Sequence, residues 1–263
     1  RDQPRSRGLG DVYKRQHCHL TDEAFDDDRL FIINDLSNFG IRGIINPATK
    51  LKDAKKAIDL ANEYENFYPM VGIHPEDVED IDDKDLEELE ELGKNEKVVA
   101  IGEIGLDYYW REDNKIKQKD IFIKQLEIAR KLSLPAVVHV RESKDDIIKI
   151  LKDYTDLKIQ IHCFSDDLKT LNTYMDMGFY ISIGGVVTFN SGKNEQIAAR
   201  NVPIERLMLE TDGPYLTPEP YRGLRNDPRR VVEVARKVAQ LRDMNIDKLA
   251  KRTYNNTKEF FNL

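Results

Sequence analysis

The sequence predicts a single (β/α)8 barrel with parallel strands and one extra helix at its C-terminal end. Short runs rich in β-forming residues alternate with amphipathic helical runs along the chain, and no Pro-, Gly- or Ser-rich linker interrupts the alternation. The 263 residues suffice for one barrel of ordinary size. We therefore expect one domain, residues 17–263, and find no sign of a second.

The predicted strands are runs of almost continuous apolar character, which is typical of parallel strands covered by helices. They lie at residues 41–46, 67–73, 97–105, 134–140, 158–163, 178–184 and 205–211, and the run that leads into His17 makes eight.

Between these runs, apolar residues recur at helical spacing. The stripes are Leu51, Ala54, Ile58 and Ala61; Phe122, Leu126, Ala129 and Leu132; and Val231, Val234, Ala235, Val238 and Leu241. Asp227 and Pro228 suit the N-cap and first position of the third of these helices. A last helix, at about residues 247–261, is expected to pack outside the barrel.

Composition excludes several classes of protein. The net charge of −7 argues against a protein that coats DNA, because sequence-independent phosphate binding needs a basic surface. No apolar run has the length needed to cross a bilayer, and two cysteines cannot build a disulfide framework. We expect a cytoplasmic enzyme that does not associate with a membrane and has no obligate protein partner.

Residues 1–16 differ from the rest of the sequence. They carry four arginines and little periodicity, and the string RGLGDVYKRQ resembles a translated sequencing adapter. We expect a non-native segment here, and a disordered basic arm is the alternative. The polar residues before His17 then replace a native first strand.

Seven residues with metal-binding or acid–base side chains fall at or near the C-terminal ends of predicted strands, where barrels of this type carry out their chemistry. They are His17, His19, His74, Glu103, His139, His162 and Asp212. Each alone could be a packed core residue or a helix cap. Together they predict a site for two divalent cations at one mouth of the barrel.

The segments HCHL, GIHP, GEIGLDYY, VVHVRES, IHCFS and LETDGPYL closely resemble the TatD-type deoxyribonuclease family of metal-dependent hydrolases, a family of (β/α)8 barrels. The resemblance runs from His17 to the C-terminus. It implies that His17, His19 and Glu103 hold one cation and that Glu103 bridges to a second, held by His139 and His162. The cations would be Mg²⁺, Mn²⁺ or Zn²⁺.

By the same resemblance, Asp212 completes the site, and it is either a ligand only or also the general base for the attacking water. Glu103 and Asp212 are thus the expected catalytic carboxylates. The implied reaction is phosphodiester hydrolysis from a DNA end, typically the 3′ end. The sequence departs from the family pattern where Arg15 replaces Asp, Gly213 replaces Ser, Asp166 replaces Gly and Leu224 replaces Lys.

Substrate contacts are expected from the rim of the barrel. His74 is the first candidate, against a role as a hydrogen-bonded loop residue. Arg141 shares a strand face with His139 and either contacts substrate or pairs with a buried carboxylate. Arg222 and Arg225 form a short basic loop past which a substrate backbone could run.

Two further side-chain groups lie next to predicted ligands. The aromatic residues of DYYW, residues 107–110, either stack unpaired bases or pack in their loop. Cys18 and Cys163 adjoin ligands, and strict alternation points both away from the site, toward the helices.

Two other functions compete with a DNA 3′–5′ exonuclease acting on single-stranded ends. One is a two-metal hydrolase of a small ester, a lactone or a phosphorylated metabolite, because related barrels carry out many hydrolyses. The other is a metal-stabilised binding module without turnover, which the intact set of acids disfavours.

Overall fold

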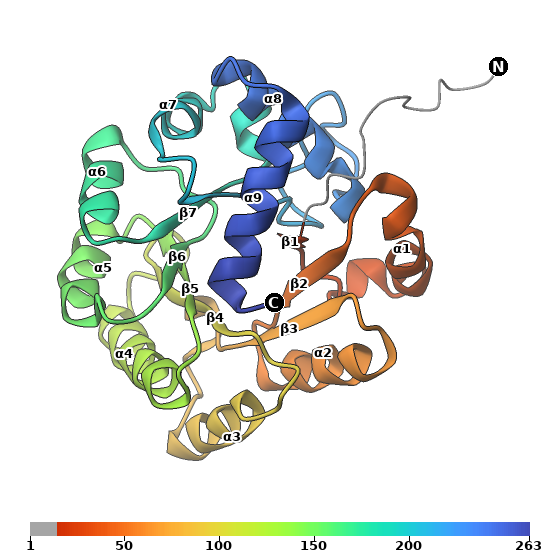
Figure 1. Cartoon of the computed structure of the whole chain (residues 1–263). Helices are drawn as coiled ribbons and strands as arrows, with labels where there is room; N and C mark the ends of the chain where they lie inside the picture. Colours follow the sequence, from red (N-terminus) through yellow and green to blue (C-terminus); the bar gives the residue numbers. More distant parts are fainter. Residues whose placement is uncertain (1–14) are drawn as a thin grey trace.

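The structure is a computed structural model that describes residues 15–263 (Figure 1). Its centre is a sheet of eight parallel strands, each paired with the next along the chain. The last and first strands meet through a parallel bridge between Cys18 and Gly213, whose carbonyl accepts a hydrogen bond of 2.8 Å from the amide of His19. The sheet closes on itself in this way, and the predicted (β/α)8 barrel is confirmed.

Most strands are shorter than their apolar runs, because only the paired part of each run belongs to the sheet. The bounds are β1 Arg15–His17, β2 Gly43–Pro47, β3 Phe67–Val71, β4 Ala100–Asp107, β5 Ala136–Arg141, β6 Ile159–Ile161, β7 Tyr180–Ile183 and β8 Leu207–Leu209. β1 begins inside the segment expected to be non-native, with Arg15 opposite Gly43 and Gln16 opposite Ile44 of β2. The other residues of that segment, 1–14, lie outside the described residues.

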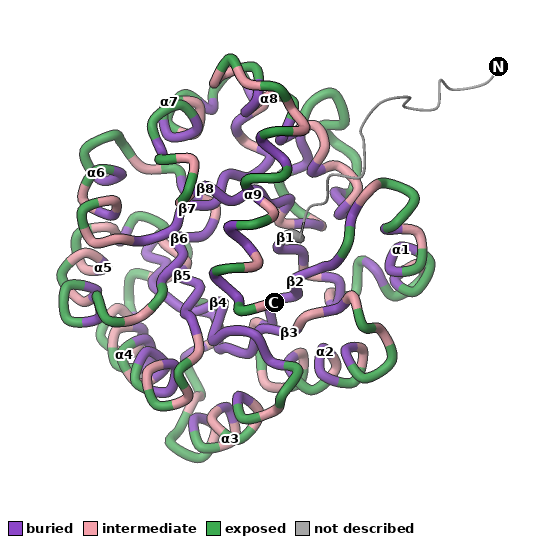
Figure 2. The backbone as a smooth tube through the Cα atoms, in the orientation of Figure 1, coloured by how far each residue is buried: buried purple, intermediate pink, exposed green. Residues whose placement is uncertain are grey.

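Within residues 15–263, eight α-helices surround the sheet, and a ninth crosses one end of it (Figure 1). The bounds are α1 Arg29–Asp35, α2 Leu51–Glu63, α3 Asp83–Gly93, α4 Lys115–Leu132, α5 Lys144–Leu151, α6 Leu168–Asp176, α7 Lys193–Asn201, α8 Val231–Leu241 and α9 Ile246–Phe261. The strands and the inner sides of the surrounding helices are buried, and the outer sides of those helices are exposed (Figure 2). None of the helices within residues 15–263 is long and apolar enough to span a membrane.

The predicted start of α8 is one turn early. The carboxylate of Asp227 accepts a hydrogen bond of 2.9 Å from the amide of Arg229, as an N-cap does. It caps a single 3-10 turn at Pro228–Arg230, and α8 follows directly from that turn.

The extent of α9 agrees with the prediction, and the helix packs outside the barrel, apart from the ring of the other helices (Figure 1). It lies across the end of the barrel at which the strands begin (Figure 1). Phe260 and Phe261 are buried in one cluster with strand residues such as Met208. The amide of Asn256 donates to the carbonyls of Ile204 and Leu207, each at 2.7 Å. Because α9 closes this end, the chemistry is left to the opposite mouth, where the strands end.

Candidate metal centre

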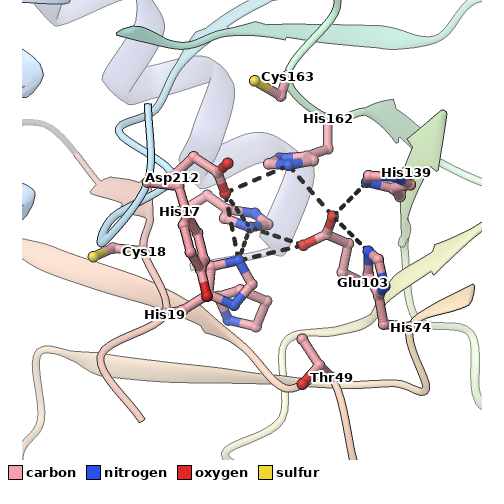
Figure 3. A network of polar contacts seen from close by, with 12 residues as sticks. His17, Cys18, His19, Thr49, His74, Glu103, His139, His162, Cys163 and Asp212 are labelled. Atoms are coloured by element: carbon pink, nitrogen blue, oxygen red, sulfur yellow. Dashed lines mark hydrogen bonds and ion pairs between the residues drawn. The ribbon is translucent and has the colours of Figure 1, made fainter. Parts of the chain in front are cut away.

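All six predicted metal ligands come together at the C-terminal ends of the strands, with the two oxygens of Glu103 at the centre (Figure 3). One oxygen, Oε2, lies 3.3 Å from Nε2 of His17 and 3.5 Å from Nε2 of His19. Oδ1 of Asp212 lies 3.8 Å and 3.4 Å from the same two nitrogens, which are themselves 3.4 Å apart. These atoms form a first donor group.

The other oxygen of Glu103, Oε1, faces a second donor group. It lies 2.9 Å from Nδ1 of His139 and 3.4 Å from Nε2 of His162. Nε2 of His162 is also 3.6 Å from Oδ1 of Asp212, so this carboxylate touches both groups. One carboxylate thus presents a separate oxygen to each of two histidine pairs.

The separations fit a divalent cation. Donor atoms about 2.1 Å from one cation lie roughly 3.0 to 3.4 Å from one another in octahedral or tetrahedral coordination. Most distances within the first group fall between 3.3 and 3.5 Å, and the longest is 3.8 Å. Imidazole nitrogens and carboxylate oxygens are ligands for Zn²⁺ and Mn²⁺, and carboxylates suit Mg²⁺. The donor set therefore suits a cation but does not select one.

Local backbone features aim these side chains. The amide of Cys18 bonds to the carbonyl of Ile45 at 3.1 Å, which holds the His17–His19 segment between β2 and the loop after β8. In β4, the register against β5 shifts between Ile101 and Ile104, and Glu103 lies within this bulge. Bulges re-aim side chains next to active sites, and this one turns Glu103 into the mouth of the barrel.

Gly105 allows β4 and β5 to approach closely beside the bulge. Its φ is +148°, and a Cβ atom there would lie 2.0 Å from the carbonyl oxygen of His139. No other residue fits this position, because a side chain would displace the strand that carries His139.

Two buried carboxylates that the sequence analysis did not single out hold the histidines of the second group. Nε2 of His139 lies 3.0 Å from Oδ2 of Asp107, and Nδ1 of His162 lies 3.0 Å from Oε2 of Glu210. A histidine whose outer N–H donates to a carboxylate keeps the lone pair of its other nitrogen for a metal. Asp107 and Glu210 therefore set Nδ1 of His139 and Nε2 of His162 as the donor atoms. The available signal for Glu210 was a carboxylate at the end of the last apolar run, two residues before Asp212.

The carboxylates dominate the electrostatics of the second group. Burial by itself lowers the pKa of His139, but hydrogen bonds to Asp107 and Glu103 outweigh it and raise the pKa to about 9. Burial also lowers the pKa of His162, yet the charges of Glu103, Glu210 and Asp212 raise it to about 10. Burial raises the pKa of Glu103, but the charge of His162 and bonds from His139 and His17 hold it well below its usual range.

His74, predicted to contact substrate, lies beside the second group. Its Nε2 is 3.7 Å from Oε1 of Glu103, and its Nδ1 accepts a hydrogen bond of 3.3 Å from the amide of Glu76. Burial, and then the charge of His139, lower the pKa of His74 to about 3, so the ring is neutral at neutral pH. Because Nδ1 accepts, Nε2 carries the hydrogen and faces the site as a donor. This tautomer suits contact with an anionic substrate and not ligation through Nε2.

The predicted arginines are placed differently from one another. The guanidinium of Arg225 forms an ion pair with Asp28 at 2.6 Å and also donates to the carbonyl of Ala24. The guanidinium of Arg222 lies 3.8 Å from the centre of the Phe189 ring. Contact of either arginine with substrate stays a prediction, and the ion pair of Arg225 argues for a structural role.

Arg141 has no carboxylate within ion-pair distance among residues 15–263. Its guanidinium lies instead over the rings of Tyr109, at 4.1 Å, and Trp110, at 5.4 Å. Of the two alternatives for Arg141, pairing with a buried carboxylate is therefore wrong.

The expectation for Cys163 is wrong, whereas that for Cys18 agrees with the structure. Cys18 is buried in the core, and its thiol lies 3.5 Å from the carbonyl of Gly213. The sulfur of Cys163 lies within 4.8 Å of ligand atoms of His162 and Asp212, near the second donor group. Strict alternation fails here because β6 ends at Ile161 and Cys163 has a φ of +45°.

Comparison with known proteins agrees with this geometry. The family described as TatD related DNase matches residues 16–262. The chain belongs to the TatD family. It is 36% identical over 249 residues to the metal-dependent hydrolase YabD of Bacillus subtilis, covering 94% of this chain and 98% of YabD. It is also 36% identical over 252 residues to the metal-dependent hydrolase YcfH of Escherichia coli K12, covering 94% of both chains.

Solved structures of TatD proteins share the fold. The crystal structure of the TatD homologue YJJV from Escherichia coli K12 superposes with a TM-score of 0.90 at 28% identity, covering 97% of this chain and 100% of that one. A TatD family hydrolase from Entamoeba histolytica, at 24% identity, has a TM-score of 0.85 over 95% of this chain and 98% of its own. The TatD chain described here is thus a metal-dependent hydrolase, and its clusters of histidines and carboxylates are the candidate metal sites.

Proposed function

We propose that this TatD protein is a divalent-metal-dependent phosphodiesterase that removes nucleotides from the 3′ ends of single-stranded DNA, with two cations at the mouth of the barrel. The proposal depends on the placement of the two carboxylate oxygens of Glu103. Oε2 faces His17 and His19, and Oε1 faces His139 and His162. A carboxylate shared in this way is a natural bridge between two cations. The deoxyribonuclease name of the family supports a nucleic-acid substrate.

The six predicted ligands would form two cation sites that share Glu103. His17, His19, Glu103 and Asp212 would hold one cation, and Glu103, His139 and His162 the other. Bound cations would make a water ligand more acidic and neutralise charge on the phosphoryl oxygens.

Asp212 is the best placed carboxylate to accept a proton from the attacking water. Its side chain is 13% exposed, against 3% for that of Glu103, so it is the carboxylate open to the solvent side of the cluster. Burial raises its pKa, but the charge of His162 and the hydrogen bond from His19 lower it, so Asp212 is ionised at neutral pH. An ionised carboxylate can act as a general base. The Nε2–H of His74 would donate to a phosphoryl oxygen on the other side of Glu103.

The test is hydrolysis of a single-stranded oligonucleotide labelled at its 3′ end, after chelation and after restoration with Mg²⁺, Mn²⁺ or Zn²⁺. We expect release of labelled mononucleotide only with a cation. Glu103→Gln should lose more activity than the loss of either His17 or His19, because it weakens both donor groups. Glu233→Gln, a change of the same kind on α8, is the control and should act as the unaltered protein does.

Three outcomes would contradict the proposal. Full activity of the chelated protein would exclude the cations from the reaction. Hydrolysis of small esters, lactones or phosphorylated metabolites without any action on oligonucleotides would assign the same site to a metabolite hydrolase, and rapid nicking of closed circular DNA would assign it to an endonuclease.

A further inference from the structure

An exposed group of two aromatic rings and a guanidinium lies beside the second donor group. Tyr109 and Trp110 lie in the turn after β4 and are 51% and 58% exposed, and their rings meet edge to face at 4.8 Å between centroids. The guanidinium of Arg141, at the end of β5, lies 4.1 Å from the centre of the Tyr109 ring. We call these three residues the aromatic platform.

The turn that carries the two rings is held firmly, although the rings are exposed. Oδ1 of Asp107 accepts hydrogen bonds from the amides of Tyr109 and Trp110, at 3.0 and 3.2 Å. The side chain of Gln118 pairs with both backbone groups of Asp107, at 2.9 and 3.0 Å. The preceding ring, that of Tyr108, is buried, and its hydroxyl donates to Asp146 at 2.6 Å. With that ring anchored inside, the backbone holds the next two rings at the surface.

Asp107 connects this platform to the metal centre. Its second oxygen, Oδ2, lies 3.0 Å from Nε2 of His139, so one buried carboxylate holds both a predicted ligand and the aromatic turn. Arg141 is two residues beyond His139 on β5, a rise of about 7 Å along the strand. The platform therefore lies within the reach of one nucleotide whose phosphate is at the histidines.

The chemistry of the platform matches an unpaired nucleobase. Flat faces of Tyr and Trp stack on any base, and a guanidinium adds attraction to the ring faces and to nearby phosphate. Arg141 has no ion-pair partner among the described residues, so its charge is not neutralised by a carboxylate in contact with it. A metabolite without a planar ring would gain nothing from these rings.

We propose that Tyr109, Trp110 and Arg141 form a subsite that stacks the base of the nucleotide next to the scissile phosphate. This inference rests on the proposed nuclease function and names the part of the substrate that the rim of the site recognises. It makes the enzyme prefer strands whose terminal bases are present and unpaired. Because every base has a flat face, the subsite gives little preference among the four bases.

The kinetic test compares two 3′-labelled strands that differ only in their two terminal nucleotides, which are thymidines in one strand and abasic residues in the other. Loss of one stacked base weakens binding roughly 5- to 150-fold. We therefore expect a higher KM for the abasic strand. Trp110→Ala and Tyr109→Ala should raise KM for the thymidine strand only, and Trp110→Phe should restore most of the difference. Phe31→Ala, which removes an exposed aromatic residue of α1, is the matched control.

A second readout does not depend on turnover. Trp110 is the only tryptophan in the chain, so its fluorescence reports the platform directly. In EDTA, where the strand is not cut, thymidine strands should quench this fluorescence to saturation and abasic strands should not. Arg141→Gln should shift the quenching to higher strand concentration.

The two readouts separate the inference from the proposed function. Equal KM values for both strands, unchanged in the platform variants, would overturn the subsite and leave the nuclease intact. Base-dependent quenching without hydrolysis of any oligonucleotide would support the subsite and overturn the proposed reaction. Absence of both hydrolysis and base-dependent quenching would overturn both.

Discussion

Replacement of Glu210 by Gln gives the sharpest test of how the metal centre is held together. Glu210 is 1% exposed and accepts two hydrogen bonds, one for each oxygen. The amide of Cys163 reaches Oε1 at 2.6 Å, and Nδ1 of His162 lies 3.0 Å from Oε2. Glutamine has nearly the same shape but only one acceptor oxygen, so it cannot accept from both donors.

Either orientation of the new amide damages the site. If the amide nitrogen faces His162, Nδ1 must accept, and the ring hydrogen moves to Nε2, the atom that should donate to a cation. If it faces Cys163, two N–H groups oppose each other in a buried place. The loss of one charge-assisted hydrogen bond is worth about 1.5 to 3 kcal/mol. If this whole loss falls on cation binding, the affinity for the cation decreases about 10- to 150-fold. This is near the usual range for residues that support metal ligands.

Calorimetric titration of the chelated protein with Mn²⁺ would measure this weakening. Glu233→Gln on α8 is the matched control, because Glu233 is partly buried and pairs with Arg236 outside the site. A thermal melt of each metal-free variant separates a lost ligand from general unfolding. The pKa of His162, about 10 with Glu210 present, should fall in Glu210→Gln. Unchanged Mn²⁺ affinity in a folded Glu210→Gln variant would refute the role assigned to this carboxylate.

Three further predictions concern protons, stability and salt. His139 and His162 have pKa values of about 9 and about 10, so both carry protons near neutral pH and must lose them to a cation. Affinity for Mn²⁺ should therefore rise with pH up to this range, with release of protons that calorimetry in buffers of different ionisation enthalpy detects; binding without proton release would contradict the pKa values. Asp167→Ala should lower the free energy of unfolding by about 1 kcal/mol, because Asp167 caps α6 through a 2.8 Å bond from the amide of Thr170, whereas Asp167→Asn should change it little in urea denaturation. Finally, KM for single strands should rise gently with salt, with a logarithmic slope of about 0.7 for each contacted phosphate; a steep rise would mean many more phosphate contacts than this acidic chain offers.

The sequence determined the barrel and the set of ligands, because both follow from local patterns. Apolar runs of strand length and stripes of helical spacing predict their elements without knowledge of the partners. Parallel strands of a barrel all end at one mouth, so residues such as Glu103 and His139, placed at strand ends, must meet there. Family motifs added the expected division of the ligands between two cations.

Only the tertiary structure decided which atoms face one another, because register, bulges and loop paths depend on contacts distant in sequence. The role of Asp107 follows from the pairing of β4 with β5, and that of Glu210 from the contact between the segments that follow β8 and β6. The ion pair of Arg225 with Asp28 joins segments 197 residues apart, and no local pattern indicates it. The inward turn of Cys163 follows from a positive φ just beyond β6, where strand alternation has ended.

The position of α9 also depends on contacts between residues distant in sequence. Its apolar stripe predicts burial but not the surface that buries it, and both the outer ring and the open end of the barrel offer apolar surface. Closure of the sheet leaves the end where the strands begin uncovered, and Phe260 and Phe261 fill it. Local sequence thus set which residues are apolar, helical or able to bind a metal, while closure of the barrel set which of them touch.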